Sequence, residues 1–307
     1  MSQSTPLRLG TRGSKLALVQ AGMVAAALRQ KAGVGCEIVT VKTSGDRIQD
    51  RPLAEAGGKG LFVKELEEAL LDGRIDFAVH SLKDLPADLP GGLCLAASMP
   101  RDVPFDALVM ARGRKAEDLP ATAVIGTSSV RRVAQLRRAY PGVQPVLLRG
   151  NVDTRLAKLD AGEVDATLLA CAGLRRLGLE ARITQVLTDW LPALAQGAVG
   201  LEARQDDRAL SLLATINDAK TFVEVACERG FQLGLSGSCR SPIAGLARAE
   251  AGRLSFRGEV LAPDGSAFVD TSFEMPLSGN AADNAAAAGD AGRVAGSHMR
   301  PLAFPWL

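Results

Sequence analysis

The chain has 307 residues, 47% of them hydrophobic and 4% aromatic, which is enough for two or three domains with real cores and excludes a disordered protein. Its 36 Lys and Arg nearly balance its 34 Asp and Glu, so the net charge of +2 indicates no class of partner. The sequence contains neither a secretory leader nor an apolar run of membrane-spanning length. We therefore expect a cytoplasmic protein.

The cysteines and histidines exclude two further classes. Five cysteines are widely spaced and form no Cys-x-x-Cys pair, which argues against a disulfide framework or a zinc site and favours a reducing compartment. Two histidines, His80 and His298, are too few for a His-rich metal site. We expect no metal.

The first hundred residues alternate strand and helix patterns. We expect strands at 7–10, 36–42, 75–79 and 92–99, and helices at 15–28 and 61–71. Ser14 is the predicted N-cap of the first helix. Residues 45–60 carry both charges without a period, which predicts a flexible loop. The alternation predicts a doubly wound α/β sheet with ligands at the carboxyl ends of its strands.

One predicted strand ends in four different polar functions. His80, Ser81, Lys83 and Asp84 follow the apolar residues 75–79. Packing explains such a cluster poorly, whereas a ligand site at a strand end explains it. A solvated turn with an incidental Lys–Asp pair remains the alternative.

A second stretch repeats the α/β plan after a predicted crossover at the prolines 100 and 104. We expect strands at 107–111, 123–126, 143–148 and 165–170, and helices at 130–140 and from 149 to 159. Residues 190–202 are interpreted as a second crossover that returns the chain to the first unit, and 206–213 as helical.

The pattern changes again from residue 221. A helix to about 231, a Gly/Ser-rich loop at 235–242 and strands at 243–249, 254–261 and 268–273 predict a small α+β domain. Residues 280–296 are rich in Ala, Gly and Asp without an apolar stripe, so we expect a loosely ordered tail. The predicted domains are 1–100 with 197–216, then 101–196, then 217–307 with an atypical tail at 280–307.

Arginines recur where predicted strands meet helices. Arg131, Arg132 and Arg155 fall in first helical turns, where the helix dipole disfavours cations. An anionic ligand would explain them, because guanidinium groups suit carboxylate or phosphate. The pattern recurs at Arg12, Arg149 and Arg176. Ordinary solvated surface arginine is the alternative.

Cys239 differs from the other cysteines because it lies in the Gly/Ser-rich loop beside Arg240. A thiol in such a place can be both reachable and partly ionised. Local context leaves a structural thiol equally open.

Taken in order, these motifs resemble the porphobilinogen deaminase family, also called hydroxymethylbilane synthase. The matching stretches are 11–14, 52–65, 79–86, 126–132, 148–156, 172–179, 196–202 and 238–242. The resemblance extends from about residue 7 to residue 273.

The resemblance implies a transferase of tetrapyrrole (haem and porphyrin) biosynthesis. It would join four porphobilinogen units head to tail, release ammonia at each addition and finally release hydroxymethylbilane by hydrolysis. The implied fold is two domains similar to periplasmic binding proteins, joined by two crossovers, plus the small third domain. The implied cofactor is dipyrromethane, held by a thioether to Cys239, in a monomer without nucleic-acid or membrane partners.

The resemblance also assigns roles to residues. Asp84, with Lys83, would be catalytic, because a carboxylate near the pyrrole nitrogens stabilises positive charge. The implied cofactor-binding set is Cys239, Ser81, Lys83, Asp84, Thr127, Ser128, Ser129, Arg131, Arg132, Arg149 and Gly150. The implied substrate-binding set is Arg12, Ser14, Lys59, Phe62, Arg149, Arg155 and Arg176. His80 would be a hydrogen-bonding support.

Three positions depart from the family pattern. Glu55 stands where a lysine is frequent, which weakens any binding role there, and Asp153 and Ala195 replace glycines. The competing hypothesis is a non-catalytic carboxylate-binding module on the same scaffold, which leaves Asp84 and Cys239 without purpose. The near-neutral charge and the single Tyr disfavour a nucleic-acid binder.

Overall fold

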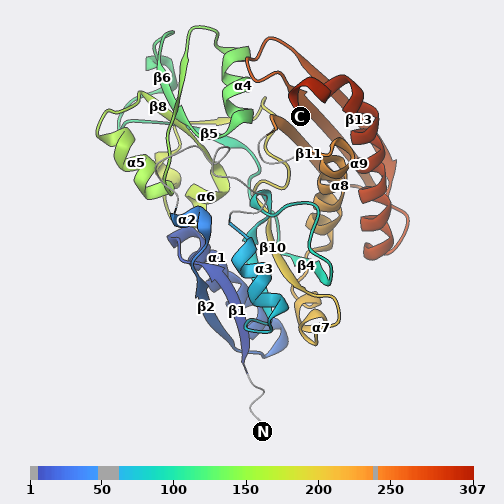
Figure 1. Cartoon of the computed structure of the whole chain (residues 1–307). Coiled ribbons are helices and arrows are strands. Elements are labelled where there is room, and N and C mark those ends of the chain that lie inside the picture. Colours follow the sequence, from blue (N-terminus) through green and yellow to red (C-terminus); the bar gives the residue numbers. More distant parts are fainter. Residues whose placement is uncertain (1–5, 48–61, 238–240) are drawn as a thin grey trace. The chain divides into compact units, whose positions relative to one another are not determined.

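The computed structural model describes residues 6–47, 62–237 and 241–307 (Figure 1). They form two five-stranded sheets with flanking helices and a three-stranded antiparallel sheet, which confirms the predicted fold class. The chain divides into two compact units, Met1–Asp102 with Ala198–Phe222, and Val103–Gly197 with Val223–Leu307. Within the described ranges, no helix is long and apolar enough to cross a bilayer.

The first unit contains a mixed sheet with helices on both faces. Its elements are β1 Leu7–Arg12, α1 Lys15–Ala32, β2 Cys36–Val41, α2 Ser44–Arg47, α3 Lys64–Leu71, β3 Phe77–Ser81, β4 Leu93–Ser98, β10 Val199–Arg204 and α7 Ala209–Ala214. The strand order is β2-β1-β3-β10-β4, and β10 runs against its neighbours. Apolar side chains of α1 and α7 pack on one face of the sheet, and those of α3 pack on the other.

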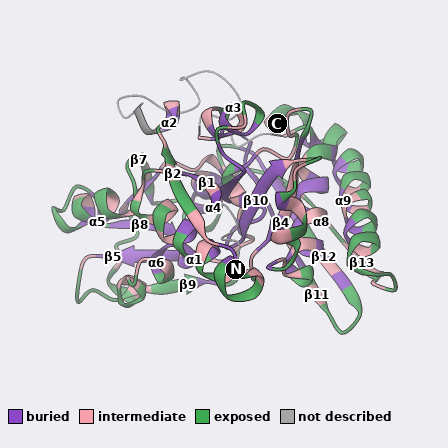
Figure 2. Ribbon diagram, turned by 90° about the horizontal axis from the view of Figure 1, so that it is seen from below, coloured by how far each residue is buried: buried purple, intermediate pink, exposed green. Residues whose placement is uncertain are grey.

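The strand β10 was expected to be part of a crossover. It pairs with β3 on one side and β4 on the other, and Figure 2 shows it buried along most of its length. Gly200 and Glu202 interrupt its apolar pattern, so the pattern did not predict a strand. A Cβ at Gly200 would lie 2.2 Å from Cδ2 of Leu82, so a larger residue there would displace that side chain.

The strand β3 begins and ends later than expected. It covers Phe77–Ser81 instead of 75–79, and a 3₁₀ turn, Leu82–Asp84, follows directly. His80 and Ser81 therefore belong to the strand and point to opposite faces of the sheet.

The start of α1 agrees with the sequence pattern. Ser14 is its N-cap, and the Ser14 hydroxyl accepts a hydrogen bond from the Ala17 amide at 3.3 Å. The prediction of a flexible loop at 45–60 is wrong for residues 45–47, because they lie in α2. The remainder of that loop, with Glu55 and Lys59, lies outside the described residues.

The second unit repeats the sheet plan. Its elements up to the return crossover are β5 Asp106–Met110, β6 Val124–Thr127, α4 Val130–Ala139, β7 Gln144–Leu147, α5 Val152–Asp160, β8 Ala166–Ala170, α6 Cys171–Arg176 and β9 Gln185–Leu187. The strand order is β7-β6-β8-β5-β9, with β5 antiparallel to both neighbours. The short strand β9 was not predicted.

The predicted α+β segment follows. It consists of α8 Ala219–Leu235, β11 Ile243–Glu250, β12 Arg253–Leu261, β13 Phe268–Pro276 and α9 Ala281–Ala303. The sheet order is β11-β12-β13, and both strand pairs are antiparallel. The boundary expected between a second and a third domain stays a prediction.

The prediction of a loosely ordered tail is wrong, because most of it forms the 23-residue helix α9. Asn280 caps the helix by accepting hydrogen bonds from two backbone amides. The buried side is a stripe of small residues that approaches α8 closely: a Cβ at Gly292 would lie 2.1 Å from the carbonyl of Cys227. Ala and Gly thus allow the backbones of α8 and α9 to come into contact. The sequence prediction depended on a stripe of large apolar residues, which this kind of packing does not need.

Candidate functional site

A cavity of about 70 Å³ opens at the carboxyl ends of β1 and β3 in the first unit. Its lining residues are Arg12, Ser14, Leu16, Ala17, Gln20, Phe62, Val63, Val79, His80, Ser81 and Asp84. Most of the polar ones follow these two parallel strands, which pair with each other and so end at the same edge of the sheet. The cavity has room for a carboxylate group or a few water molecules.

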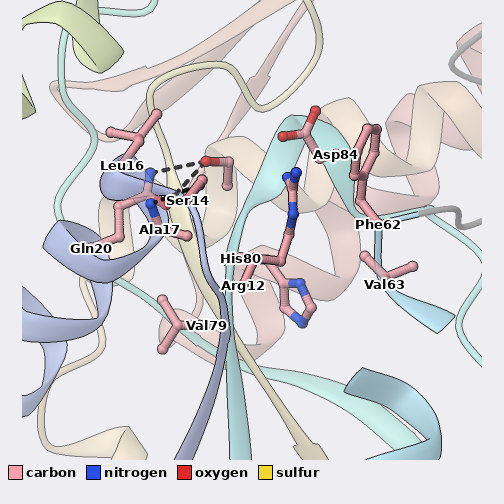
Figure 3. Close-up of a pocket in the computed structure, with 11 residues that line it drawn as sticks. Arg12, Ser14, Leu16, Ala17, Gln20, Phe62, Val63, Val79, His80 and Asp84 are labelled. Atoms are coloured by element: carbon pink, nitrogen blue, oxygen red, sulfur yellow. Dashed lines mark hydrogen bonds between the residues drawn. The ribbon is translucent and has the colours of Figure 1, made fainter. Parts of the chain in front are cut away.

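One wall of this cavity is an arginine stacked on an aromatic ring. The guanidinium carbon of Arg12 lies 4.1 Å from the centre of the Phe62 ring, a cation–π contact (Figure 3). Asp84 follows from the 3₁₀ turn and is exposed at the same cavity, so its carboxylate is accessible to a ligand. Lys83 precedes it but is not among the lining residues.

The opposite wall is a hydrogen-bonded pair of neutral groups. The amide of Gln20 in α1, 2% exposed, donates to the Ser81 hydroxyl at 2.9 Å. This bond joins the helix to the end of β3. Gln20 was not singled out from the sequence, because a lone glutamine on a helix carries no signal.

The cavity also contacts a buried ionisable pair. Nε2 of His80 lies 3.0 Å from Oε2 of Glu202 in β10. Burial and the charge of Glu202 raise the pKa of Glu67 in α3 to about 7, while His80 acts in the opposite direction. Glu202 was missed in the sequence, although a lone carboxylate in an apolar strand signals a partner.

In the second unit, the predicted anion-binding arginines surround a buried carboxylate. Arg131 donates to Asp106 at 2.8 Å, and Arg132 donates to the other oxygen of the same carboxylate at 2.7 Å. Burial alone would raise the pKa of Asp106, but the two positive charges outweigh it and hold that pKa well below its ordinary value. Gln196 donates to the same carboxylate at 2.9 Å.

These arginines were expected to be available cations, and the structure instead gives both a counter-charge. Burial also lowers the pKa of the Arg131 guanidinium, with Asp106 opposing it. The Nε group of Arg131 is buried without a hydrogen-bond partner among the described residues. One donor there is thus still available.

The junction between β6 and α4 presents a row of hydroxyls. Ser129 caps α4 and accepts from the Arg132 amide at 3.4 Å, and the Ser129 amide donates to the Thr127 hydroxyl at 3.2 Å. Ser128 accepts a hydrogen bond from Arg155 at 2.9 Å. Arg155 also donates to the carbonyl of Gly150, whose φ of +114° favours glycine.

Two further predicted arginines follow the neighbouring strands β7 and β8. Nη1 of Arg149 is buried and has no hydrogen-bond partner among the described residues. Arg176, at the end of α6, donates to the carbonyl of Gly197 at 2.6 Å. The strands β7, β6 and β8 are parallel neighbours, so their carboxyl ends bring these arginines and the hydroxyl row to one edge.

The structure thus gathers the predicted residues into two groups. Arg12, Ser14, Phe62, Ser81 and Asp84 meet at the cavity of the first unit. Thr127, Ser128, Ser129, Arg131, Arg132, Arg149, Gly150, Arg155 and Arg176 lie at strand and helix ends of the second. Cys239 and Lys59 lie outside the described residues.

Comparison with known proteins gives three results. Residues 7–211 match the model of the porphobilinogen deaminase dipyromethane cofactor binding domain, and residues 222–291 match the porphobilinogen deaminase C-terminal domain. A porphobilinogen deaminase of Nitrobacter hamburgensis is 49% identical over 291 residues, which cover 93% of this chain and 91% of that protein.

Solved structures with a related arrangement include the methionine binding protein MetQ, with a TM-score of 0.45, 14% identity and coverage of 68% of this chain and 87% of that one. A periplasmic substrate-binding protein of an ABC transporter from Coxiella burnetii has a TM-score of 0.45, 15% identity and coverage of 69% and 92%. Both matches are distant in sequence. The two family models and the relative cover nearly the whole chain, and the chain belongs to the porphobilinogen deaminase family.

Proposed function

We propose that this chain condenses porphobilinogen at the cavity of its first unit and holds the carboxylates of the growing product with the arginines of its second. As a member of its family it is a transferase of tetrapyrrole biosynthesis that uses a dipyrromethane cofactor. The observation that carries the division of labour is the exposed Asp84 carboxylate at a cavity with stacked Arg12 in the first unit. The second unit differs, because guanidinium groups gather at its strand ends.

The residues of the second unit fit a cofactor that bears acidic side chains. The buried Nη1 of Arg149 and the buried Nε of Arg131 lack partners among the described residues, and a carboxylate would satisfy both. Thr127, Ser128 and Ser129 add hydroxyl donors beside the first turn of α4. Cys239 would hold the cofactor covalently. When bound, dipyrromethane supplies the pyrrole end to which substrate is joined.

The cavity residues divide into binding and catalysis. Arg12 and Ser14 would hold a carboxylate of the incoming porphobilinogen, and Ser81 would orient it. Asp84 would stabilise the positive charge that develops on the pyrrole when ammonia departs. Lys83 would hold a substrate carboxylate at the edge of the cavity. Arg155 and Arg176 would hold carboxylates of the product at the strand edge of the second unit.

Intact mass spectrometry and an ammonia-release assay test this proposal. The purified protein should exceed its sequence mass by two linked pyrrole units and should release ammonia from porphobilinogen. Asp84→Asn should keep the added mass but lose about 10²–10³-fold in kcat. The exposed neighbour Asp88 does not line the cavity, so Asp88→Asn is the matched control. Wild-type turnover in Asp84→Asn would exclude the assigned role.

Compartment and assembly belong to the same proposal. We expect a cytoplasmic monomer, because the cysteine pattern favours a reducing compartment. None of the four cysteines in the described part of the chain forms a disulfide, and Cys171 and Cys227 are buried. Sedimentation equilibrium of the loaded enzyme checks the monomer.

A further inference from the structure

The cavity of the first unit contains an ionisable pair for which the proposed function has no use. The side chains of His80 and Glu202 are 3% and 0% exposed, and yet His80 lines the cavity. Burying a carboxylate and an imidazole together costs several kcal/mol unless they compensate each other. A pair kept at that cost beside a reaction site calls for a role in the reaction.

The sheet fixes the geometry of this pair. His80 lies opposite Gly200 in the antiparallel register of β3 and β10, and Glu202 lies opposite Ala78. The two side chains are therefore diagonal neighbours on one face of paired strands, where long side chains meet. Because both come from buried strands, the imidazole is held in a narrow range of orientations.

Each member of the pair keeps one unused position. Oε1 of Glu202 is buried and has no hydrogen-bond partner among the described residues. The second ring nitrogen of His80, Nδ1, likewise receives no hydrogen bond from the described part of the chain. A carboxylate behind an imidazole orients the ring and stabilises the imidazolium that forms when the other nitrogen takes up a proton.

Several ionisable groups surround this pair. Glu67 of α3 interacts with both members, Glu68 interacts with Glu67, and Cys94 of β4 interacts with Glu202. Arg12 and Asp84 line the cavity itself. In the described residues, no group of three or more His, Cys, Asp and Glu side chains is arranged to hold a metal ion.

We propose that His80, oriented by Glu202, accepts the proton released when porphobilinogen units are joined; this rests on the proposed function of the cavity. Joining breaks the C–N bond of the protonated aminomethyl group, and its electron pair leaves with ammonia. A C–C bond then forms to the free α-carbon of the preceding porphobilinogen-derived ring. The C–H bond at that carbon breaks, its electrons restore the aromatic ring, and the proton passes through His80 to ammonia, which departs as ammonium.

This assignment separates two tasks that one carboxylate performs poorly. Asp84 must remain negative while the ring cation lasts, and a carboxylate that accepts the proton loses that charge. A separate imidazole keeps Asp84 ionised throughout. Histidine is also the side chain that most often exchanges protons at neutral pH.

Kinetics of the loaded enzyme with porphobilinogen deuterated at its free α-carbon provide the first test. His80→Gln should lower kcat by about 10²-fold and Glu202→Gln by about 10-fold, because the proton acceptor and its orienting partner are lost. The isotope effect on kcat should rise in both variants, since the C–H step becomes rate-limiting. His298→Gln and Glu68→Gln, on exposed residues, are the matched controls.

A lower kcat with an unchanged isotope effect would mean that the pair is only structural and would overturn the inference. Absence of ammonia release by the wild-type enzyme would instead refute the proposed function itself. The two failures are therefore distinguishable in one set of preparations.

A spectroscopic test does not depend on turnover. The chain has two histidines, so ¹⁵N-imidazole spectra contain two sets of signals, and His298→Gln assigns them. We expect the Nε2 signal of His80 to be that of a protonated nitrogen bonded to a carboxylate, and Glu202→Gln to change its tautomer or charge. Identical His80 signals in both proteins would contradict the orienting role of Glu202.

Discussion

The two five-stranded sheets share a plan and differ in the chemistry at their ends. In each sheet, the strand in fourth place runs antiparallel to its neighbours. The strand in second place contains a Gly-Thr pair and is followed by a serine that caps a helix. These residues are Gly10, Thr11 and Ser14 in the first sheet, and Gly126, Thr127 and Ser129 in the second. The first sheet ends in an exposed carboxylate above a His–Glu pair. The second ends in arginines gathered around a carboxylate.

In both sheets the buried acid comes from the reversed strand. Glu202 lies in β10 and meets His80, whereas Asp106 begins β5 and meets Arg131 and Arg132. One acid facing an imidazole makes a site for proton exchange. One acid facing two guanidinium groups leaves a net positive edge suited to carboxylates. A buried acid on the reversed strand thus takes part in different chemistry in the two sheets, according to its partner.

We expect the largest effect when the buried ion pairs of the second sheet are removed. Asp106→Asn leaves two buried guanidinium groups without their counter-charge and should lower the free energy of unfolding by about 3–5 kcal/mol, measured by urea denaturation. Asp76→Asn in the first unit is the control, because its partner Arg8 is 41% exposed and the loss there should be about 1 kcal/mol or less. Equal losses would show that burial does not distinguish the two pairs.

The two Gly-Thr junctions should respond unequally to an added methyl group. A Cβ at Gly126 would meet Cβ of Leu148 at 2.8 Å, close to its backbone, whereas a Cβ at Gly10 would meet the mobile end of Ile75 at 2.3 Å. We expect Gly126→Ala to cost about 1–3 kcal/mol and Gly10→Ala less, since only the latter clash is relieved by a rotamer change. Thermal unfolding of both variants measures the difference, and the reverse order would contradict it.

Glu67, the acid near the His–Glu pair, predicts that stability depends on pH through the first sheet and not through the second. Because the pKa of Glu67 is raised to about 7, the folded state holds a proton there that the unfolded chain, with a value near 4.5, releases. Its stabilisation is complete below the unfolded pKa and is lost as the pH rises through 7. Glu67→Gln should therefore add about 1–2 kcal/mol at pH 8 and little at pH 4. Glu37→Gln, on an exposed residue of β2, is the control, and a gain independent of pH would disprove the assignment.

The smallest effect concerns the crossover that leaves the second unit. Ala195 has a φ of +57°, a left-handed conformation that favours glycine, and its amide donates to Glu228. Ala195→Gly should stabilise by about 0.5–1 kcal/mol, because released strain exceeds the added chain entropy. A lower melting temperature would indicate that the alanine side chain contributes packing instead.

The sequence predicts the parts of the fold with strong local patterns. Ser14 was predicted as a cap and is one. Of the residues at the first cavity, His80, Ser81 and Asp84 were named from a strand end and Phe62 from the family resemblance, whereas Gln20 was not named. The strand β10 and the helix α9 were not predicted. In β10 a glycine and a buried acid interrupt the apolar pattern, and in α9 alanines and glycines stand in place of large apolar residues. Both elements depend on close approach, of the Leu82 side chain to Gly200 and of the Cys227 carbonyl to Gly292, which composition does not reveal.

The site was predictable where the signal is local, and not where it depends on pairing. Arg12 and Asp84 follow their own strands and could be found. Glu202 and Asp106 act on residues far away in the sequence, so their partners emerge only from the register of the sheets. The same holds for Gln20, whose bond to Ser81 joins a helix to a distant strand end.

The position of β10 between β3 and β4 constrains the order in which the two sheets can fold while the chain is being synthesised. The sheet of the first unit is divided until that strand arrives, and the strand is synthesised only after the whole sheet of the second unit. The second sheet is continuous in sequence and can form on the ribosome while the first waits with exposed strand edges. Glu202 arrives with that strand, so the His–Glu pair forms late, and chains truncated before β10 should lack it.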